Sequence, residues 1–215
     1  MKFFDCKPAP SPRRVRIFLR EKGIEVPTVE IDLRSGEQLG DAFRQVNPEG
    51  TVPVLELDDG TRISEALAIC AYLEEAYPDP RLFGRDARER ALAIMWNGKV
   101  EQQGLMAVAE LFRNRSKAFQ NRALPGPHKF EQIPQLAERG RLRTELFFDR
   151  LNAHLADHEY LVGDQFTIAD ITALVVADFA AGSKISIEEK QRHLRRWYDK
   201  VSSRPTIPEP GDYPG

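Results

Sequence analysis

The sequence predicts two domains: an α/β domain with a small mixed four-stranded sheet, followed by an all-α helical bundle. In the first eighty residues, short apolar strands alternate with helical patterns in the order βαβ and then ββα. A βαβ crossover implies a parallel strand pair, and a tight hairpin adds antiparallel strands, which makes the sheet mixed. After Pro78-Asp79-Pro80 no strand-like segment follows. We therefore expect domains at 1–80 and 86–205, and an irregular tail at 206–215.

The first half of the α/β domain reads as a strand, a helix and a second strand. Apolar residues at 2–6 predict a buried strand, and the alternation over 26–33 predicts its parallel neighbour. The helix between them, 12–22, carries an apolar stripe that includes Val15 and Phe18. Lys22 is in phase with that stripe, so we expect it to lay its stem on apolar surface and keep its ammonium in water.

The second half of this domain reads as a short helix, a hairpin and a longer helix. The short helix ends at Asn47-Pro48, because the residue before a proline disfavours helical backbone. The turn Asp58-Asp59-Gly60 joins two strand-like runs, which is the signature of a hairpin. The expected bounds are 38–46 for the first helix, 52–57 and 62–64 for the strands, and 65–77 for the last helix.

The C-terminal domain is helical throughout. Helical patterns cover 87–119, 136–158, 171–179 and 188–203, with a proline-rich loop at 121–134. Thr167 and Asp170 have the spacing of a capping box and precede the apolar helix at 171–179.

Composition favours a soluble globular protein and disfavours several other classes. The formal net charge is −2 and no apolar run approaches a membrane span, so we expect neither nucleic acid nor membrane as a partner. The N-terminus lacks a signal peptide's apolar core, and two cysteines fit a reducing compartment, so we expect a cytoplasmic protein. The four histidines are scattered, so we expect no metal site.

Four motifs, in order, resemble the glutathione S-transferase family. They are residues 41–48 (DAFRQVNP), 51–55 (TVPVL), 64–69 (SEALAI) and 166–171 (FTIADI). These sequence motifs are similar to those of the theta- and zeta-like branches. Residues 10–17 and 50–61 resemble an atypical fungal and bacterial subgroup that lacks the usual N-terminal catalytic Ser, Cys or Tyr. The resemblance implies a thioredoxin-like N-terminal domain, a homodimer, and glutathione as a cosubstrate rather than a cofactor.

The resemblance assigns a glutathione-binding set in the first domain: Gln38, Thr51, Val52, Pro53, Glu65 and Ala66. It implies a cis Val52-Pro53 bond, which leaves the Val52 backbone open to pair with the cysteinyl part of glutathione. Glu65 would meet the ammonium of glutathione, and the start of the helix at Ala66 its γ-glutamyl carboxylate. Gln38 would hold the glycyl carboxylate. The simpler interpretations are an edge strand at Val52, a first-turn acid at Glu65 and a solvated helix residue at Gln38.

The residue that activates the glutathione thiol is missing from its usual place. The resemblance puts Ala9 at the family's Ser or Cys position, and puts Ala109 and Arg113 where the atypical subgroup holds a water through Ser and His. Ser11 is a candidate donor, although it is also a candidate N-cap. Arg113 is a candidate for stabilising the thiolate, with Asn114 beside it, and the alternative is a solvated basic helix face.

The electrophile pocket is expected between the domains, on Met106, Glu110, Phe112 and Ser116, with Phe119 nearby. The predicted function is conjugation of the glutathione thiolate to a small hydrophobic electrophile in detoxification, with attack on a peroxide as a side activity. The alternative is a non-catalytic glutathione-binding, ligand-carrying or interaction protein of the same fold. A thiol–disulfide oxidoreductase is disfavoured because Cys6 lacks the second cysteine of Cys-x-x-Cys.

Overall fold

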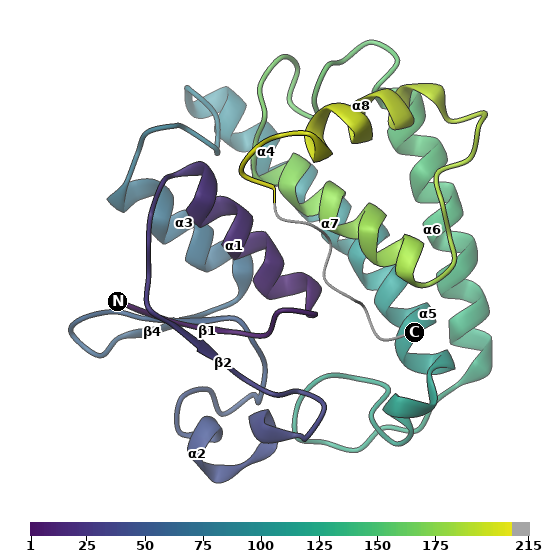
Figure 1. The fold of residues 1–215 in the computed structure, drawn as a ribbon. Coiled ribbons are helices and arrows are strands. Elements are labelled where there is room, and N and C mark those ends of the chain that lie inside the picture. The colour runs from purple at the N-terminus through teal and green to yellow at the C-terminus, as the bar shows by residue number, and fades with distance from the viewer. Residues whose placement is uncertain (208–215) are drawn as a thin grey trace.

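The N-terminal domain is built on a mixed four-stranded sheet, as predicted (Figure 1). The computed structural model describes residues 1–207, so the predicted tail 206–215 lies almost entirely outside the described residues. The strands are β1 (Lys2–Asp5), β2 (Thr28–Glu30), β3 (Val54–Glu56) and β4 (Arg62–Ser64), in the order β2-β1-β3-β4. β1 pairs with β2 in parallel, and β1–β3 and β3–β4 are antiparallel.

The two faces of this sheet are covered by different helices. Phe3 and Leu55 pack with α1 (Pro10–Glu21) and α3 (Ala66–Ala76) in the main core. Phe4 and Val54 point to the other face, where they pack with Phe43 of α2 (Asp41–Arg44). This alternation is the period of two that a strand imposes on its side chains. Figure 1 shows α1 and α3 together on one side of the strands and α2 on the other.

The start of α1 and the segment 38–46 differ from the sequence prediction. α1 begins at Pro10, and its N-cap is Ala9, which offers no side-chain hydrogen bond, so Ser11 is not the N-cap. The single helix predicted at 38–46 is a 3-10 turn, η1 (Glu37–Leu39), followed by α2. Gly40 separates the two pieces because its backbone is extended, with φ −71° and ψ 154°.

The C-terminal domain consists of helices around a buried central helix, α7. The elements are α4 (Ala87–Val100), a π-helical turn η2 (Glu101–Leu105), α5 (Met106–Arg115), a 3-10 turn η3 (Lys117–Phe119), α6 (Pro134–His154), α7 (Ile168–Gly182) and α8 (Arg192–Ser202). The helix predicted over 87–119 is therefore interrupted at Glu101 and ends in a tighter turn. Arg143 of α6 donates to the carbonyl of Gln102 at 2.6 Å and so satisfies an acceptor within the π-helical turn.

The capping box that the sequence predicts is present at the start of α7. Thr167 Oγ1 accepts from the Ala169 N–H, and Asp170 Oδ2 accepts from the Thr167 N–H at 3.0 Å. Asp170 Oδ1 also accepts from Leu161 N and Trp197 Nε1. Complete burial raises the pKa of Asp170 to about 6, although these hydrogen bonds act in the opposite direction. One carboxylate thus joins α7, α8 and the loop before α7.

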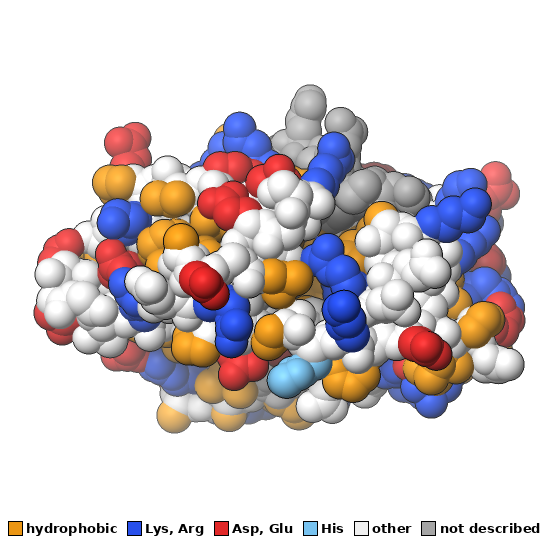
Figure 2. Space-filling model, turned by 90° about the horizontal axis from the view of Figure 1, so that it is seen from below, with side chains coloured by type: hydrophobic (Ala, Val, Ile, Leu, Met, Phe, Trp, Pro, Cys, Tyr) orange, Lys and Arg blue, Asp and Glu red, His pale blue; other side chains and the backbone are white. Residues whose placement is uncertain are grey.

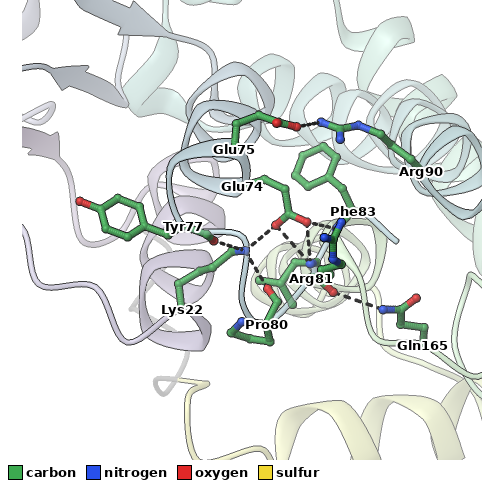
Figure 3. Close-up of polar contacts among 10 residues, drawn as sticks. Lys22, Glu74, Glu75, Tyr77, Pro80, Arg81, Phe83, Arg90 and Gln165 are labelled. Carbon is green, nitrogen blue, oxygen red and sulfur yellow. Dashed lines mark hydrogen bonds and ion pairs between the residues drawn. The ribbon is translucent and has the colours of Figure 1, made fainter. Parts of the chain in front are cut away.

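A buried ion pair fixes the linker between the two domains (Figure 3). Lys22 Nζ lies 2.6 Å from Glu74 Oε2 and donates to the carbonyls of Tyr77 and Pro80, each at 2.7 Å. Glu74 Oε1 accepts from the backbone N–H groups of 82–83 at 3.1 Å. The Lys22 side chain is fully buried, so the prediction that its ammonium reaches water is wrong. Its charge is instead neutralised by a carboxylate from another helix.

Two further ion pairs join α1 to the helical domain. Arg13 Nη1 donates to Asp178 Oδ2 of α7 at 2.5 Å, and Tyr198 of α8 donates to Asp178 Oδ1 at 2.6 Å. Arg14 Nη1 donates to Glu101 in the π-helical turn. The first helix of the α/β domain is therefore bound to the second domain by charge as well as by apolar packing.

Helix α6 closely approaches both η2 and α5, at two glycines. A Cβ built on Gly104 would lie 2.5 Å from Cε1 of Phe147. A Cβ on Gly140 would lie 2.6 Å from both the Ala107 carbonyl oxygen and the Leu111 nitrogen. The second contact is with backbone, which cannot rotate away as a side chain would.

Gly140→Ala is expected to lower the free energy of unfolding by about 1–3 kcal/mol, because the added methyl forces α5 and α6 apart. Urea unfolding followed by circular dichroism measures this change. The matched control is Gly98→Ala in α4, where a Cβ meets nothing within 4 Å. That change should instead stabilise the protein by about 0.5–1 kcal/mol, since alanine is the better helix former. Equal effects of the two variants would contradict the close approach at Gly140.

Candidate functional site

The sheet register brings the candidate glutathione-binding segments to one edge. Phe4 pairs with Val54, so the carboxyl end of β1 lies beside the amino end of β3. Val54 also pairs with Ser64, which places the end of β4 at the same edge. Because β2 runs parallel to β1, its carboxyl end lies there too. The loops that follow β1 and β2, the loop before β3 and the start of α3 therefore meet.

Val52 stands at this edge with its backbone open. The Val52-Pro53 peptide is cis, as the family resemblance implies. Asn47 Nδ2 donates to the carbonyl and hydroxyl oxygens of Thr51, at 2.8 and 3.0 Å, and holds the preceding turn. Within residues 1–207 neither the N–H nor the C=O of Val52 has a hydrogen-bond partner. This segment can therefore accept an extended peptide as an added strand.

Glu65 has an unusual backbone conformation immediately before α3. Its φ is 67° and its ψ 121°, which only glycine adopts without strain. The side chain is exposed, and it forms no hydrogen bond with the described residues. Ala66, the first residue of α3, is buried and contributes only its backbone N–H. The first-turn N–H groups of this helix, next to an unpaired carboxylate, suit a ligand that carries both a carboxylate and an ammonium.

Gln38 lies in η1 and is buried, contrary to the interpretation of a solvated helix residue. Its Oε1 has no partner within the described residues. Gly50 approaches the Gln38 backbone so closely that a Cβ there would lie 3.0 Å from the carbonyl oxygen. The loop before Val52 thus packs directly on the turn that carries this amide.

Ser11 lies in the first turn of α1, next to the domain interface. Its Oγ accepts from Arg14 Nη2 at 3.4 Å, and Arg14 is in turn bound to Glu101. The N-cap residue Ala9 has no side-chain donor. Sequence reasoning did not identify Glu101, because its position opposite Arg14 depends on the π-helical turn, for which the apolar pattern gives no signal.

The two cysteines are buried thiols. Cys6 follows β1 and Cys70 lies in α3. Desolvation raises the pKa of both thiols, which opposes formation of a thiolate.

Arg113 and Asn114 are engaged with the loop that follows α5. Arg113 Nε and Nη2 donate to the carbonyls of Ala123 and Arg122, at 3.1 and 2.7 Å. Burial, together with the nearby Arg122 charge, lowers the pKa of Arg113 to about 10. Asn114 donates to the Glu110 carbonyl and accepts from the backbone N–H of residue 133. Both ends of the Asn114 amide are thus used within the domain.

Three residues of the predicted electrophile pocket lie on two different faces of α5, and Ser116 lies just beyond the end of this helix. Glu110 accepts from Arg139 and Arg143 of α6. Burial tends to raise the pKa of Glu110, but these two arginines outweigh it and lower the pKa overall. Met106, one turn earlier on the same face, is exposed. Phe112 instead packs against Phe179 of α7, and Ser116 follows one turn later.

Phe112 also packs on Phe119, with ring centroids 5.1 Å apart. The structure therefore brings Phe112 and Phe119 together, and it does not bring Met106 and Glu110 to them.

Two other surface features lie apart from the candidate site. Two surface hollows of about 300 and 320 Å³ lie along α6, around Glu145 and Gln191, and neither contains a predicted site residue. No three His, Cys, Asp or Glu side chains of the described residues are grouped so that they could hold a metal ion. None of the described helices is long and apolar enough to cross a bilayer.

Comparison with known proteins agrees with this geometry. The models of the glutathione S-transferase N-terminal and C-terminal domains match residues 9–76 and 108–205. Glutathione S-transferase 2 of Saccharomyces cerevisiae is 33% identical, over 96% of this chain and 88% of that protein.

Two solved structures are similar along nearly the whole chain. A glutathione S-transferase domain-containing protein of Marinobacter aquaeolei has 38% identity, a TM-score of 0.89 and coverage of 97% of this chain and 100% of that one. A Gtt2-class glutathione S-transferase of Vibrio parahaemolyticus has 37% identity, a TM-score of 0.84 and coverage of 99% and 98%. By fold, by motif and by similarity over nearly its full length, the chain belongs to the glutathione S-transferase family.

Proposed function

We propose that this protein transfers the thiolate of glutathione to a small apolar electrophile. One observation supports this most strongly: the open backbone of Val52, the strained Glu65 and the starts of α1 and α3 occupy the same edge of the sheet. Strained backbone persists where the surroundings hold it, and it clusters at ligand sites.

Glutathione would bind in an extended form along this edge. Its cysteinyl part would pair with the Val52 N–H and C=O. Its γ-glutamyl carboxylate would accept from the first N–H groups of α3, and its ammonium would meet Glu65. Gln38 would donate to the glycyl carboxylate. Because position 66 is alanine, we expect backbone donors alone at the γ-glutamyl carboxylate, and hence weaker binding there.

The thiol would then point to the start of α1. Ser11 accepts from Arg14, which leaves its own O–H free to donate to the sulfur. The backbone N–H of Ser11 and the positive end of the α1 dipole also favour negative charge there. The thiol proton leaves to solvent; the thiolate sulfur forms a bond to the electrophilic carbon, and the leaving group departs with the bonding electrons. Arg113 remains the second candidate for stabilising the thiolate.

The electrophile would lie on Phe112 and Phe119, beside Ser116. Met106 and Glu110 are not included in this pocket, since Glu110 is paired with α6. We place the protein in the cytoplasm. We also propose a homodimer, because Ile94, Met95 and Met106 leave exposed apolar side chains along α4 and α5.

Titration of the thiolate absorbance of bound glutathione tests the proposed function. We expect a thiol pKa well below the value of about 8.5 for a free thiol. Ser11→Ala should raise that bound pKa by about one unit, which corresponds to about 1.4 kcal/mol of lost thiolate stabilisation. The control Ser203→Ala, at the end of α8, should leave it unchanged. Saturable binding with an unshifted thiol pKa would instead favour a non-catalytic glutathione-binding protein.

A further inference from the structure

Arg113 differs from the buried arginines of α1 in its electrostatic partners. Arg13 pairs with Asp178, and Arg14 pairs with Glu101. Within residues 1–207, no carboxylate forms an ion pair with Arg113, although its guanidinium is partly buried. A charge removed from water without a counter-ion is costly, and an anionic ligand would offset that cost.

The hydrogen bonds of Arg113 hold it in place without neutralising it. Nε and Nη2 donate to two neutral carbonyls of the loop after α5, at 3.1 and 2.7 Å. The guanidinium carbon lies 4.4 Å from the ring centroid of Phe119. Within the described residues Nη1 makes no hydrogen bond, and it is not among the buried polar atoms that lack a partner. It is therefore accessible and can donate to a ligand.

A second cation stands beside it. Arg122 is half-buried, forms no ion pair within residues 1–207, and its charge is close enough to lower the pKa of Arg113. Two guanidinium groups that share a site without an acid repel each other until an anion binds between them. Figure 2 shows Lys and Arg side chains next to apolar ones near the middle of the face that holds α2 and this loop in Figure 1.

The loop that carries Arg122 reaches the glutathione edge of the first domain. A Cβ on Gly126 would lie 3.4 Å from the carbonyl oxygen of Glu49, two residues before Thr51. The Phe119 ring lies under the Arg113 guanidinium and packs against the ring of Phe112. Cationic and apolar surfaces are thus adjacent, beside a loop that reaches the proposed glutathione edge.

We propose that Arg113 and Arg122 bind a carboxylate of the electrophilic substrate, whose apolar body lies on Phe112 and Phe119. The substrate class is an aromatic or similarly apolar electrophile that carries one carboxylate. This inference rests on the proposed function and specifies its second substrate. A guanidinium binds a carboxylate through charge-assisted and often bidentate hydrogen bonds, which would orient the electrophilic carbon toward the sulfur.

Two electrophiles that differ at one substituent, charged in one and neutral in the other, test the inference. 4-Chloro-3,5-dinitrobenzoate and its carboxamide both react by forming a carbon–sulfur bond and releasing chloride. For each, kcat/KM is divided by the uncatalysed rate constant, which removes their difference in intrinsic reactivity. We expect the wild type to favour the carboxylate, and Arg113→Gln to lower its value by about 10- to 100-fold, as loss of a charge-assisted contact would. The carboxamide value should fall by a clearly smaller factor, so the ratio of the two values reports the contact with the carboxylate.

Three variants separate recognition from a purely structural role. Arg113→Lys keeps the charge and should retain part of the preference for the carboxylate. Arg115→Gln removes an exposed charge two residues away and should change neither value. Replacing the acids beyond the described residues, E209Q/D212N, should leave the preference unchanged, and a preference that appears only in this variant would assign the arginines to those acids instead.

Each remaining outcome gives a definite answer. Equal losses for both electrophiles in Arg113→Gln would overturn the inference and favour the role of Arg113 in stabilising the thiolate or anchoring the loop. Wild-type turnover of both electrophiles without preference would overturn the inference but leave the proposed function standing. Turnover of neither would overturn both.

Discussion

Glu74→Ala is expected to lower the free energy of unfolding by about 3–5 kcal/mol, because it leaves the buried Lys22 ammonium without a carboxylate. Lys22 keeps two carbonyl acceptors, from Tyr77 and Pro80, but these carry no charge. The backbone N–H groups of 82–83 also lose their acceptor, which adds the cost of unsatisfied buried donors. Urea unfolding, followed by intrinsic fluorescence and far-UV circular dichroism, measures the loss.

The adjacent acid provides a matched control. Glu75 pairs with Arg90 on the surface, as Figure 3 shows next to the buried pair. Glu75→Ala should cost at most about 1 kcal/mol, because an exposed ion pair contributes little. A Glu74→Ala variant as stable as Glu75→Ala would show that Lys22 finds water or another acid, and would contradict the buried pair.

Asp178→Ala should have a comparable effect, about 3–5 kcal/mol, at the contact between the two domains. It removes the α7 carboxylate that pairs with the Arg13 guanidinium, which is 1% exposed. It also removes the acceptor of the Tyr198 hydroxyl. Because Arg13 belongs to α1 and Asp178 to α7, we expect weaker attachment of the domains, visible as faster amide exchange in α1 as well as a lower unfolding midpoint.

Two companion variants identify the cause of that loss. Tyr198→Phe removes one hydrogen bond and should cost about 1 kcal/mol. The double variant R13M/D178L removes both charges, and it should recover most of the stability that Asp178→Ala loses, since apolar residues of similar volume often replace a buried ion pair without cost. A double variant less stable than Asp178→Ala would instead assign the loss to packing.

The sequence predicts those parts of the fold that depend on neighbouring residues. The hairpin of β3 and β4 follows from the turn residues 58–60, and the cap of α7 follows from Thr167 and Asp170 at a fixed spacing. The candidate glutathione set was predicted in the same way, from motifs whose residues lie within a few positions of each other. The sheet register places Val52 and Glu65 at the same edge, because Val54, two residues after Val52, pairs with Ser64, the residue before Glu65.

The features that the sequence does not predict depend on distant partners. The sequence pattern around Lys22 is the same whether its ammonium contacts water or the carboxylate of Glu74, 52 positions away. Only the packing of α1 on α3 determines which of the two contacts forms. The residues around Glu65 give no indication of its positive φ. The division of the predicted electrophile pocket has the same origin, because Arg139 and Arg143 come from α6.

The π-helical turn at 101–105 sets the rotational phase between the two halves of a long helix. An α-helix turns by about 100° per residue, and a π-helical turn accommodates one additional residue. Glu101, at the start of this turn, faces Arg14 of the first domain, whereas Glu110, beyond it, faces α6. A chain shorter by one residue here could form a regular helix, but it could not satisfy both partners at once. The additional residue thus allows one long helix to form both contacts, with the first domain and with α6, which a regular α-helix would not align.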